Sequence, residues 1–207
     1  MSTPSPRRTA RLAAALLAPV LLLTGCTGMQ GTGDLEYVEG DGQVIELVGE
    51  DRVGPVDLSG ETVDGEDYDI ADVRGSVVVV NVWWSGCGPC VTEMPMLTEL
   101  DAAYDDEDVS FVGINIRDSS AENAAAFERD TGVEYPSIYD PSSQTLLAFP
   151  GRATPRFPPT TLVLDAEGKV AGIINGAIPS RATLTTLVQS AGGPEAPERT
   201  DEPDGSA

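Results

Sequence analysis

Two cysteines separated by a Gly-Pro pair, Cys87-Gly88-Pro89-Cys90, are the residues of this sequence best suited to carry out chemistry. They follow a strongly apolar stretch, Val77 to Trp83, which predicts a buried strand, and they lead into a segment with helical spacing. A thiol at a helix start lies beside unpaired N–H groups and the positive end of the macrodipole. Its pKa is thereby lowered from about 8.5 to roughly 3.5–7.5. Because two such cysteines can also close on each other, the pattern predicts thiol–disulfide exchange.

The composition narrows the remaining chemistry. The chain of 207 residues has 12 Lys and Arg against 34 Asp and Glu, a formal charge of −22, and no histidine. The charge argues against nucleic acid and against a polybasic membrane patch. The lack of histidine excludes Cys/His proteases, Ser/His hydrolases, histidine-ligated haem and most zinc or copper sites. We expect no metal and no cofactor other than a redox-active disulfide.

The N-terminus has the features of an export signal. Arg7, Arg8 and Arg11 form a basic region before a twelve-residue apolar stretch, Leu12 to Leu23, and a bilayer-spanning helix would need about 20 residues. The stretch ends in Leu23-Thr24-Gly25-Cys26, which resembles the lipobox of bacterial lipoproteins. That resemblance implies that Cys26 receives a lipid and becomes the first mature residue. The alternative is ordinary signal cleavage, with Cys26 incidental.

A lipidated Cys26 would settle the odd cysteine count, because Cys87 and Cys90 would remain as a pair in a compartment where disulfides persist. The chain is then predicted to have four parts. These are a lipoprotein signal peptide (1–25), a lipidated cysteine with a flexible tether (26–41), a folded domain (42–191) and a disordered acidic tail (192–207).

The domain alternates predicted strands and helices, which indicates an α/β sandwich with a mixed sheet. The expected elements besides the first buried strand are a hairpin of Val56–Leu58 and Tyr68–Ile70, a helix over Cys90–Tyr104 kinked at Pro95, a strand over Val109–Ile116, helices over Ala121–Asp130 and Ser142–Phe149, strands over Thr160–Leu164 and Lys169–Ile174, and a final helix over Arg181–Ser190.

With these residues in place, the chain resembles the thioredoxin fold, and more narrowly the membrane-tethered thiol–disulfide reductases of the TlpA/ResA type. The resemblance covers roughly Val53 to Ala191 and rests on the strand end at Trp83, the dithiol, Glu93 with Pro95, and the segment Phe157 to Asp165. It implies a thioredoxin-like three-layer sandwich with a central mixed β-sheet, an N-terminal β-hairpin and a helix–strand insertion.

The same resemblance implies roles at the dithiol. Cys87 would be the exposed attacking thiol and Cys90 the buried resolving one, with Gly88 and Pro89 as the middle pair found in thioredoxin. At least one of Trp83 and Trp84 is expected to pack near them. Many relatives have a tryptophan at the position of Gly86, so its absence predicts a more open Cys87.

Three further residues would form the substrate-binding segment. Pro159 matches the cis-proline of the family and lies between Pro158 and Thr160. The residue before that proline usually offers its N–H to the substrate, but Pro158 has none. Docking is therefore expected to use the Pro158 carbonyl and neighbouring side chains.

The buried acid of thioredoxin is replaced here by Asn81, so the proton of the resolving thiol needs another acceptor. Glu93, one helical turn after Cys90, matches a glutamate of the family. It is either that supporting acid or an exposed first-turn acid that stabilises the helix dipole.

The expected function is reduction of disulfides in exported proteins, for example in apocytochrome c or oxidase assembly, with electrons from a membrane thiol transporter. These partners follow from the resemblance alone. We expect a monomer anchored as a lipoprotein at the outer face of the cytoplasmic membrane. Two alternatives remain, namely a disulfide-forming oxidase or isomerase, and a non-catalytic lipid-anchored binding module with a structural disulfide.

Overall fold

The computed structural model describes residues 43–104 and 108–195. The predicted signal peptide, the tether, Cys26 and most of the predicted tail lie outside these residues. In chain order, the strands and α-helices are β1 (Val44–Glu46), β2 (Ser59–Glu61), β3 (Asp67–Asp69), β4 (Val77–Trp83), α1 (Gly88–Ala103), β5 (Val109–Asn115), α2 (Ala121–Thr131), β6 (Ser137–Tyr139), β7 (Thr160–Leu164), β8 (Val170–Asn175) and α3 (Arg181–Ser190). Four short 3₁₀ helices, η1 (Gly49–Asp51), η2 (Ile70–Val73), η3 (Thr145–Ala148) and η4 (Gly151–Ala153), complete the described elements.

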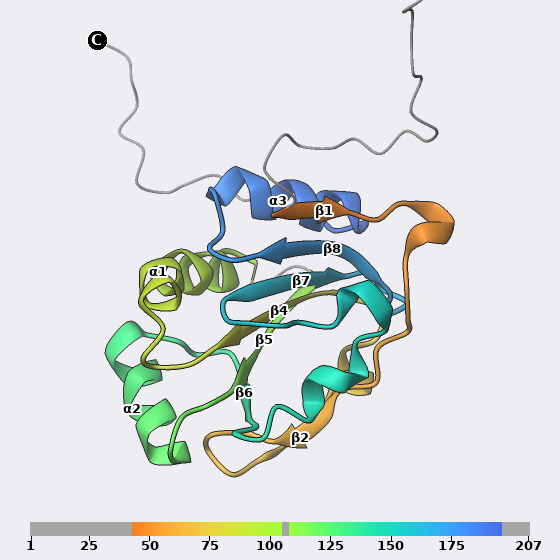
Figure 1. The fold of residues 1–207 in the computed structure, drawn as a ribbon. Coiled ribbons are helices and arrows are strands. Elements are labelled where there is room, and N and C mark those ends of the chain that lie inside the picture. The colour runs from red at the N-terminus through yellow and green to blue at the C-terminus, as the bar shows by residue number, and fades with distance from the viewer. Residues whose placement is uncertain (1–42, 105–107, 196–207) are drawn as a thin grey trace, which may run out of the picture. The chain divides into compact units, whose positions relative to one another are not determined.

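The centre of the fold is a mixed six-stranded sheet with the order β1-β8-β7-β4-β5-β6 (Figure 1). Strands β4, β5 and β6 are parallel, and the other neighbours are antiparallel. The hairpin of β2 and β3 forms a separate two-stranded sheet. The parallel order makes the carboxyl ends of β4, β5 and β6 meet at one edge, where ligand sites of open α/β sheets form.

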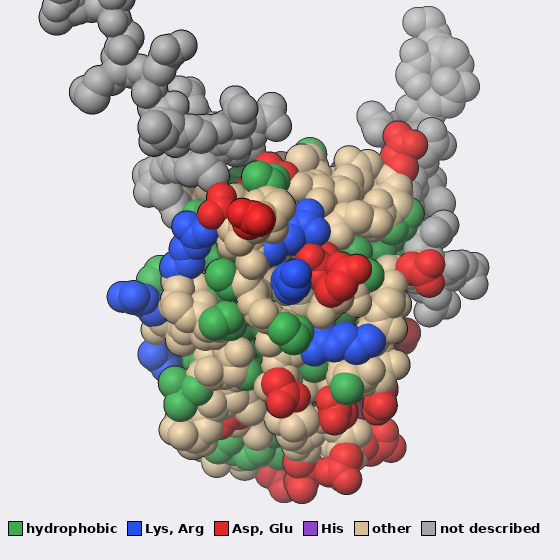
Figure 2. All heavy atoms as spheres, turned by 90° about the vertical axis from the view of Figure 1, so that its right-hand side faces the viewer, with side chains coloured by type: hydrophobic (Ala, Val, Ile, Leu, Met, Phe, Trp, Pro, Cys, Tyr) green, Lys and Arg blue, Asp and Glu red, His purple; other side chains and the backbone are tan. Residues whose placement is uncertain are grey.

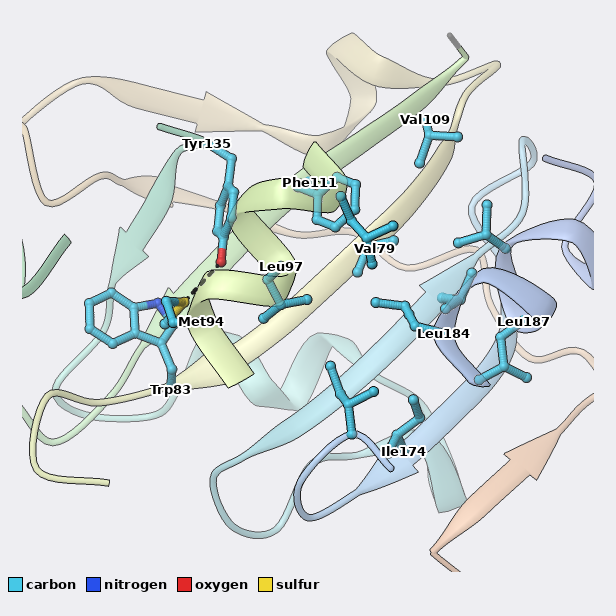
Figure 3. Packing of buried hydrophobic residues seen from close by; sticks show 14 of the residues in the cluster. Val79, Trp83, Met94, Leu97, Val109, Phe111, Tyr135, Ile174, Leu184 and Leu187 are labelled. Atoms are coloured by element: carbon cyan, nitrogen blue, oxygen red, sulfur yellow. Dashed lines mark hydrogen bonds between the residues drawn. The ribbon is translucent and has the colours of Figure 1, made fainter. Parts of the chain in front are cut away.

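Strand β4 is buried throughout and apolar except for Asn81, because both of its faces are covered. Val79 and Trp83 point into a core shared with the helices, and this core contains Met94 and Leu97 of α1 together with Leu184 and Leu187 of α3 (Figure 3). The alternate residues Val78, Val80 and Val82 face a second core. That second core is made with η2, η3 and the segment that leads into the hairpin, through Val56, Leu58, Ile70, Leu146 and Phe149. Helices, sheet and 3₁₀ turns thus form the three layers predicted for a thioredoxin-like fold.

The helix ends follow local sequence rules. Ser120 and Ser180 cap α2 and α3 by accepting hydrogen bonds from the N–H groups of Asn123 and Thr183. Gly132 ends α2 in the left-handed conformation, with φ 75°, which a glycine adopts without steric penalty. These signals explain why the predicted bounds of α2 and α3 agree with the structure to within one residue.

Some predicted elements differ from the structure. The hairpin exists, but its paired strands are Ser59–Glu61 and Asp67–Asp69, because Leu58 and Ile70 are buried in the second core. The predicted helix over Ser142–Phe149 is only the 3₁₀ turn η3. Asp140 accepts hydrogen bonds from both the N–H and the hydroxyl of Thr145, which fixes a turn there. The three-residue strands β1 and β6 were not predicted, since a periodic pattern needs a longer run.

Acidic side chains gather on the hairpin. Figure 2 shows the right-hand side of Figure 1, with red side chains along its lower edge, below the blue ones. The exposed acids of the hairpin are Glu61, Asp64, Glu66, Asp67 and Asp69. Across the described ranges, none of the helices has the length and apolar content that crossing a membrane requires.

Candidate active site

The two cysteines form a disulfide at the junction of β4 and α1. Their Cα atoms are 5.2 Å apart. Cys87 is the N-cap of α1, and its Sγ accepts a hydrogen bond from the N–H of Cys90 at 3.2 Å. Pro89 lies in the first turn, where its missing N–H removes no helical bond. The sulfur that would carry the negative charge after reduction is therefore already in contact with an N–H group at the helix start.

Cys87 is more exposed than Cys90, as predicted, but the difference in exposure is smaller than expected. Cys90 is completely buried, and Cys87 is only 6% exposed in this disulfide form. The expectation of an openly exposed Cys87 is therefore wrong for the oxidised protein.

Trp84 packs against the core cluster that contains Cys87. A Cβ atom built on Gly86 would lie 2.3 Å from the Trp84 ring, so the indole lies directly against that glycine. The expectation that at least one of the two tryptophans packs near the site is met by Trp84, whose ring comes from two residues upstream of Gly86. A glycine is needed at position 86 because the ring occupies the space that any side chain would take.

Asn81 and Glu93 are in contact in the interior. The side-chain N–H₂ of Asn81 donates to Glu93 at 3.0 Å and to the Thr161 hydroxyl at 3.1 Å. The second carboxylate oxygen of Glu93 accepts from the N–H of Ile178 at 3.1 Å. Glu93 is only 5% exposed, so it is not the exposed first-turn acid of the alternative interpretation.

Burial raises the pKa of Glu93 to about 7, because desolvation of the charged form outweighs the hydrogen bonds from Ile178 and Asn81, which lower it. Residues three apart on a helix lie on one face, so Glu93 and Cys90 are neighbours along α1. The arrangement places a carboxyl group able to exchange a proton near neutral pH beside the buried cysteine.

The bond between Pro158 and Pro159 is cis, as the resemblance predicted. Thr160 is paired with Val82 in the β7–β4 ladder, so Pro159 lies beside the end of β4 that leads to the disulfide. The Pro159 carbonyl accepts from the N–H of Gly176 at 2.9 Å. The buried Thr160 hydroxyl donates to the Phe157 carbonyl at 2.7 Å, so it stabilises the turn, while Phe157 itself is 50% exposed.

Trp83 is fully buried below the site. Its Nε1 donates to the Ser137 hydroxyl at 3.3 Å, and its ring stacks on Phe127 with centroids 5.1 Å apart. Figure 3 shows Met94 of α1 beside the indole, with the Tyr135 hydroxyl donating to its sulfur. Trp83 therefore anchors the end of β4 rather than facing a ligand.

Three contributors were not anticipated from the sequence. Ser85 and Asp118 are hydrogen-bonded to each other just before Cys87, and Ile178 reaches Glu93 from the segment before α3. The only signal for Asp118 was a polar residue shortly after a buried parallel strand. No local pattern marks Ile178, because its contribution is a backbone N–H. Within residues 43–104 and 108–195, we find no group of three or more acidic or cysteine side chains that could hold a metal ion.

The mixed sheet, the cis-proline beside the end of β4 and the dithiol at the N-terminus of α1 define a thioredoxin-like protein. Residues 50–189 match the Redoxin family profile, so the chain belongs to the Redoxin family.

Several proteins of similar sequence or structure are named as thiol–disulfide proteins. Over 116 residues the chain is 31% identical to the thiol-disulfide oxidoreductase ResA of Geobacillus thermodenitrificans, covering 56% of this chain and 64% of the relative. It thus spans less than two thirds of that relative's length. A solved DsbF homologue of Corynebacterium diphtheriae has a TM-score of 0.65 and 30% identity, covering 74% of this chain and 96% of that one. A secreted thiol-disulfide isomerase of Corynebacterium glutamicum has a TM-score of 0.63 and 30% identity, covering 75% and 96%.

Proposed function

We propose that this protein is an extracytoplasmic thiol–disulfide oxidoreductase that reduces disulfides of exported proteins through Cys87 and Cys90. The observation that carries the proposal is the Cys87–Cys90 disulfide at the start of α1, in which Cys87 Sγ accepts the Cys90 N–H. A purely structural disulfide would gain little from a position at a helix start, since a disulfide within one helical turn constrains little of the chain. The similar ResA proteins, named as oxidoreductases, support the same activity.

The proposed cycle starts from the dithiol. Cys87 thiolate attacks one sulfur of a substrate disulfide, the substrate S–S bond breaks, and the other substrate sulfur leaves as a thiolate. Cys90 then loses its proton and attacks Cys87 Sγ, which releases the second substrate sulfur and forms the Cys87–Cys90 disulfide. Two electrons pass to the substrate, and the protons of the two thiols are balanced by protonation of the substrate sulfurs.

Glu93 is proposed as the group that accepts the Cys90 proton. It is buried one turn from Cys90, and its pKa of about 7 lets it both take up and release a proton near neutral pH. Asn81 positions the carboxylate, in place of the acid that thioredoxin has at that strand position. Trp83, Gly88 and Pro89 support the two cysteines through packing and helix geometry.

Substrate is proposed to bind along the Pro158–Pro159–Thr160 segment, beside the end of β4. Pro158 has no N–H to offer, so we assign docking to its carbonyl and to apolar contacts with the exposed Phe157. The protein substrates are proposed to be exported ones such as apocytochrome c or oxidase subunits, and the electron donor a membrane thiol transporter.

Location and domain limits complete this proposal. The signal peptide, lipidation of Cys26, the tether up to residue 41 and the acidic tail from residue 192 would place the domain at the outer face of the membrane. Labelling of cells with a radioactive fatty acid tests the anchor. Wild type should incorporate label, and Cys26→Ser should not.

Insulin reduction tests the activity. The full chain carrying Cys26→Ser should reduce insulin, and the further change Cys87→Ser should abolish this activity. Equal activity in both proteins, or none in either, would leave the disulfide as a structural brace. A stable complex with a protein substrate should form with Cys90→Ser, because the mixed disulfide cannot be resolved.

A specific observation also keeps the oxidase or isomerase function as a second candidate, since the similar Corynebacterium glutamicum structure is named an isomerase. Redox titration separates the two functions. The Gly-Pro middle pair is that of thioredoxin, at about −270 mV, whereas protein disulfide isomerase is near −180 mV and DsbA near −120 mV. A midpoint well below about −200 mV supports the reductase, and one far above it supports the oxidase or isomerase.

A further inference from the structure

A buried carboxylate holds the loop that precedes Cys87. Asp118, three residues after the end of β5, is 6% exposed. Its Oδ2 accepts from the N–H of Ser85 at 2.9 Å and from the side chain of Asn115 at 2.7 Å, and its Oδ1 accepts from the Ser85 hydroxyl. The backbone carbonyl of Asp118 in turn accepts from the Tyr139 hydroxyl at 3.2 Å. The carboxyl ends of β4, β5 and β6 are thereby connected through one residue.

Ser85 lies between Trp84 and Gly86 in the sequence, two positions before Cys87. The N–H of Cys87 donates to the Trp84 carbonyl at 3.1 Å, which makes the connection a tight turn. Because Asp118 binds both the backbone and the side chain of Ser85, it fixes this turn relative to the sheet. This turn sets the position of Cys87 Sγ relative to the N–H of Cys90.

Asp118 is not used by the helix that follows it. The N-cap of α2 is Ser120, whose hydroxyl accepts from the N–H of Asn123. Arg117, just before Asp118, has a φ of 66°, a left-handed conformation that is unfavourable for a non-glycine residue. The chain thus adopts an unfavourable backbone conformation next to a carboxylate that binds Ser85 in the β4–α1 turn and Asn115 at the end of β5.

We propose that Asp118 is a positioning residue for thiol–disulfide exchange, which clamps Ser85 so that the Cys87 thiolate stays on the N–H groups at the start of α1. The inference rests on the proposed role of Cys87 as the attacking thiol. Asp118 is proposed to act through its hydrogen bonds and not through its charge, because a second negative charge at this end of the sheet would destabilise a thiolate. Removing the charge while keeping the hydrogen bonds should therefore leave Cys87 reactive, whereas removing the hydrogen bonds should not.

Asp118→Asn and Asp118→Ala separate these effects. The asparagine has the same shape; its oxygen can accept from Ser85 and Asn115, and its N–H₂ can donate to the Ser85 hydroxyl. The alanine leaves the Ser85 N–H and the Asn115 side chain without their acceptor. Tyr139→Phe serves as the matched control, because it removes a bond to the backbone of Asp118 and leaves the carboxylate contacts intact.

The measurement is the rate at which iodoacetamide alkylates Cys87 in the reduced full chain carrying Cys26→Ser at pH 7, followed by mass spectrometry of the Cys87 peptide. We expect Asp118→Ala to react about tenfold more slowly than the parent. Asp118→Asn and Tyr139→Phe should react at the parent rate or faster. Thermal unfolding of each variant establishes that it is folded at the assay temperature.

Two results would overturn the inference. They are an Asp118→Ala protein that reacts at the parent rate or faster, whatever its unfolding temperature, and an Asp118→Asn protein as slow as the alanine variant. Alkylation needs no substrate turnover, so this outcome is independent of the insulin assay. If Cys87→Ser still reduced insulin, the proposed function would fail while the alkylation rates still reported on the clamp.

Discussion

The Asn81 side chain on β4 donates a hydrogen bond to the Glu93 carboxylate on α1 at 3.0 Å, in the interior below the disulfide. An amide and an acid thus take the place where thioredoxin has one buried acid on the strand. The carboxyl group is moved from the sheet to the helix that begins at the dithiol. A pKa of about 7 follows from its burial.

The raised pKa of Glu93 predicts how stability depends on pH. Between about pH 4.5 and 7 the folded protein retains a proton that the unfolded chain releases, so the free energy of unfolding of the oxidised protein should fall as pH rises through this window. Each unit of pKa shift corresponds to about 1.4 kcal/mol. Urea unfolding of Glu93→Gln at several pH values should show a smaller fall, and the exposed Glu61→Gln should behave like the parent. An unchanged slope in Glu93→Gln would contradict the assignment.

Glu93→Gln should also slow the resolving step specifically. Without a proton acceptor beside Cys90, we expect release of the mixed disulfide to slow by about 100-fold at pH 7, with little change in the initial attack by Cys87. Single-turnover reduction of a peptide disulfide, quenched with acid and followed by mass spectrometry, measures both steps. The control is Glu128→Gln on α2, because burial also raises the pKa of Glu128 to about 7. An equal slowing in both variants would argue against a role specific to Glu93.

Gly86→Ala should displace the indole of Trp84. The new Cβ atom would lie 2.3 Å from the ring, so the ring must move, and we expect this movement to uncover Cys87. We expect faster alkylation of reduced Cys87 and a loss of about 1–3 kcal/mol in the free energy of unfolding. Gly88→Ala is the matched control, since nothing lies within 4 Å of a Cβ atom there. If Gly86→Ala and Gly88→Ala reacted alike, Trp84 would not be the cover.

Gly113→Ala should destabilise the domain strongly. A Cβ atom there would lie 2.1 Å from the Ser137 hydroxyl and 2.7 Å from Trp83 Nε1, between β5 and its neighbours. Overpacking of this kind costs about 1–3 kcal/mol or more. Gly172→Ala on β8 meets Leu187 at 3.1 Å, a contact that a small shift relieves, so its cost should be lower. Thermal unfolding of the two variants checks that Gly113→Ala loses more stability than Gly172→Ala. The reverse result would be evidence against this packing.

Pro158→Ala should strengthen substrate binding. The alanine restores an N–H at the position where an extended substrate would pair, so a peptide with an internal disulfide should bind the Cys87→Ser, Cys90→Ser protein more tightly, by about 1 kcal/mol. Phe157→Ala should weaken the same binding, whereas Leu147→Ala, an exposed apolar residue on η3, should not. Fluorescence anisotropy measures all three. No change in Pro158→Ala would disfavour the carbonyl-based docking.

The sequence alone determined the class of chemistry and much of the framework. The apolar residues of β4, the dithiol that follows them and the capping residues Ser120 and Ser180 act through local geometry, which neighbouring residues decide. The fold class was therefore predicted correctly, and the cis bond at Pro159 followed from family resemblance. The short strands β1 and β6 were missed because pairing with partners far along the chain defines them.

Only the tertiary structure decided how the site is covered and supported. The burial of Glu93 depends on Asn81, Thr161 and the N–H of Ile178, which come from three different parts of the chain. The contact of Asp118 with Ser85 likewise joins residues 33 positions apart, and the Trp84 ring folds back over Gly86, two residues after it in the chain. The free energy of a charge in the interior depends on all atoms packed around it, and no spacing along a chain records those neighbours.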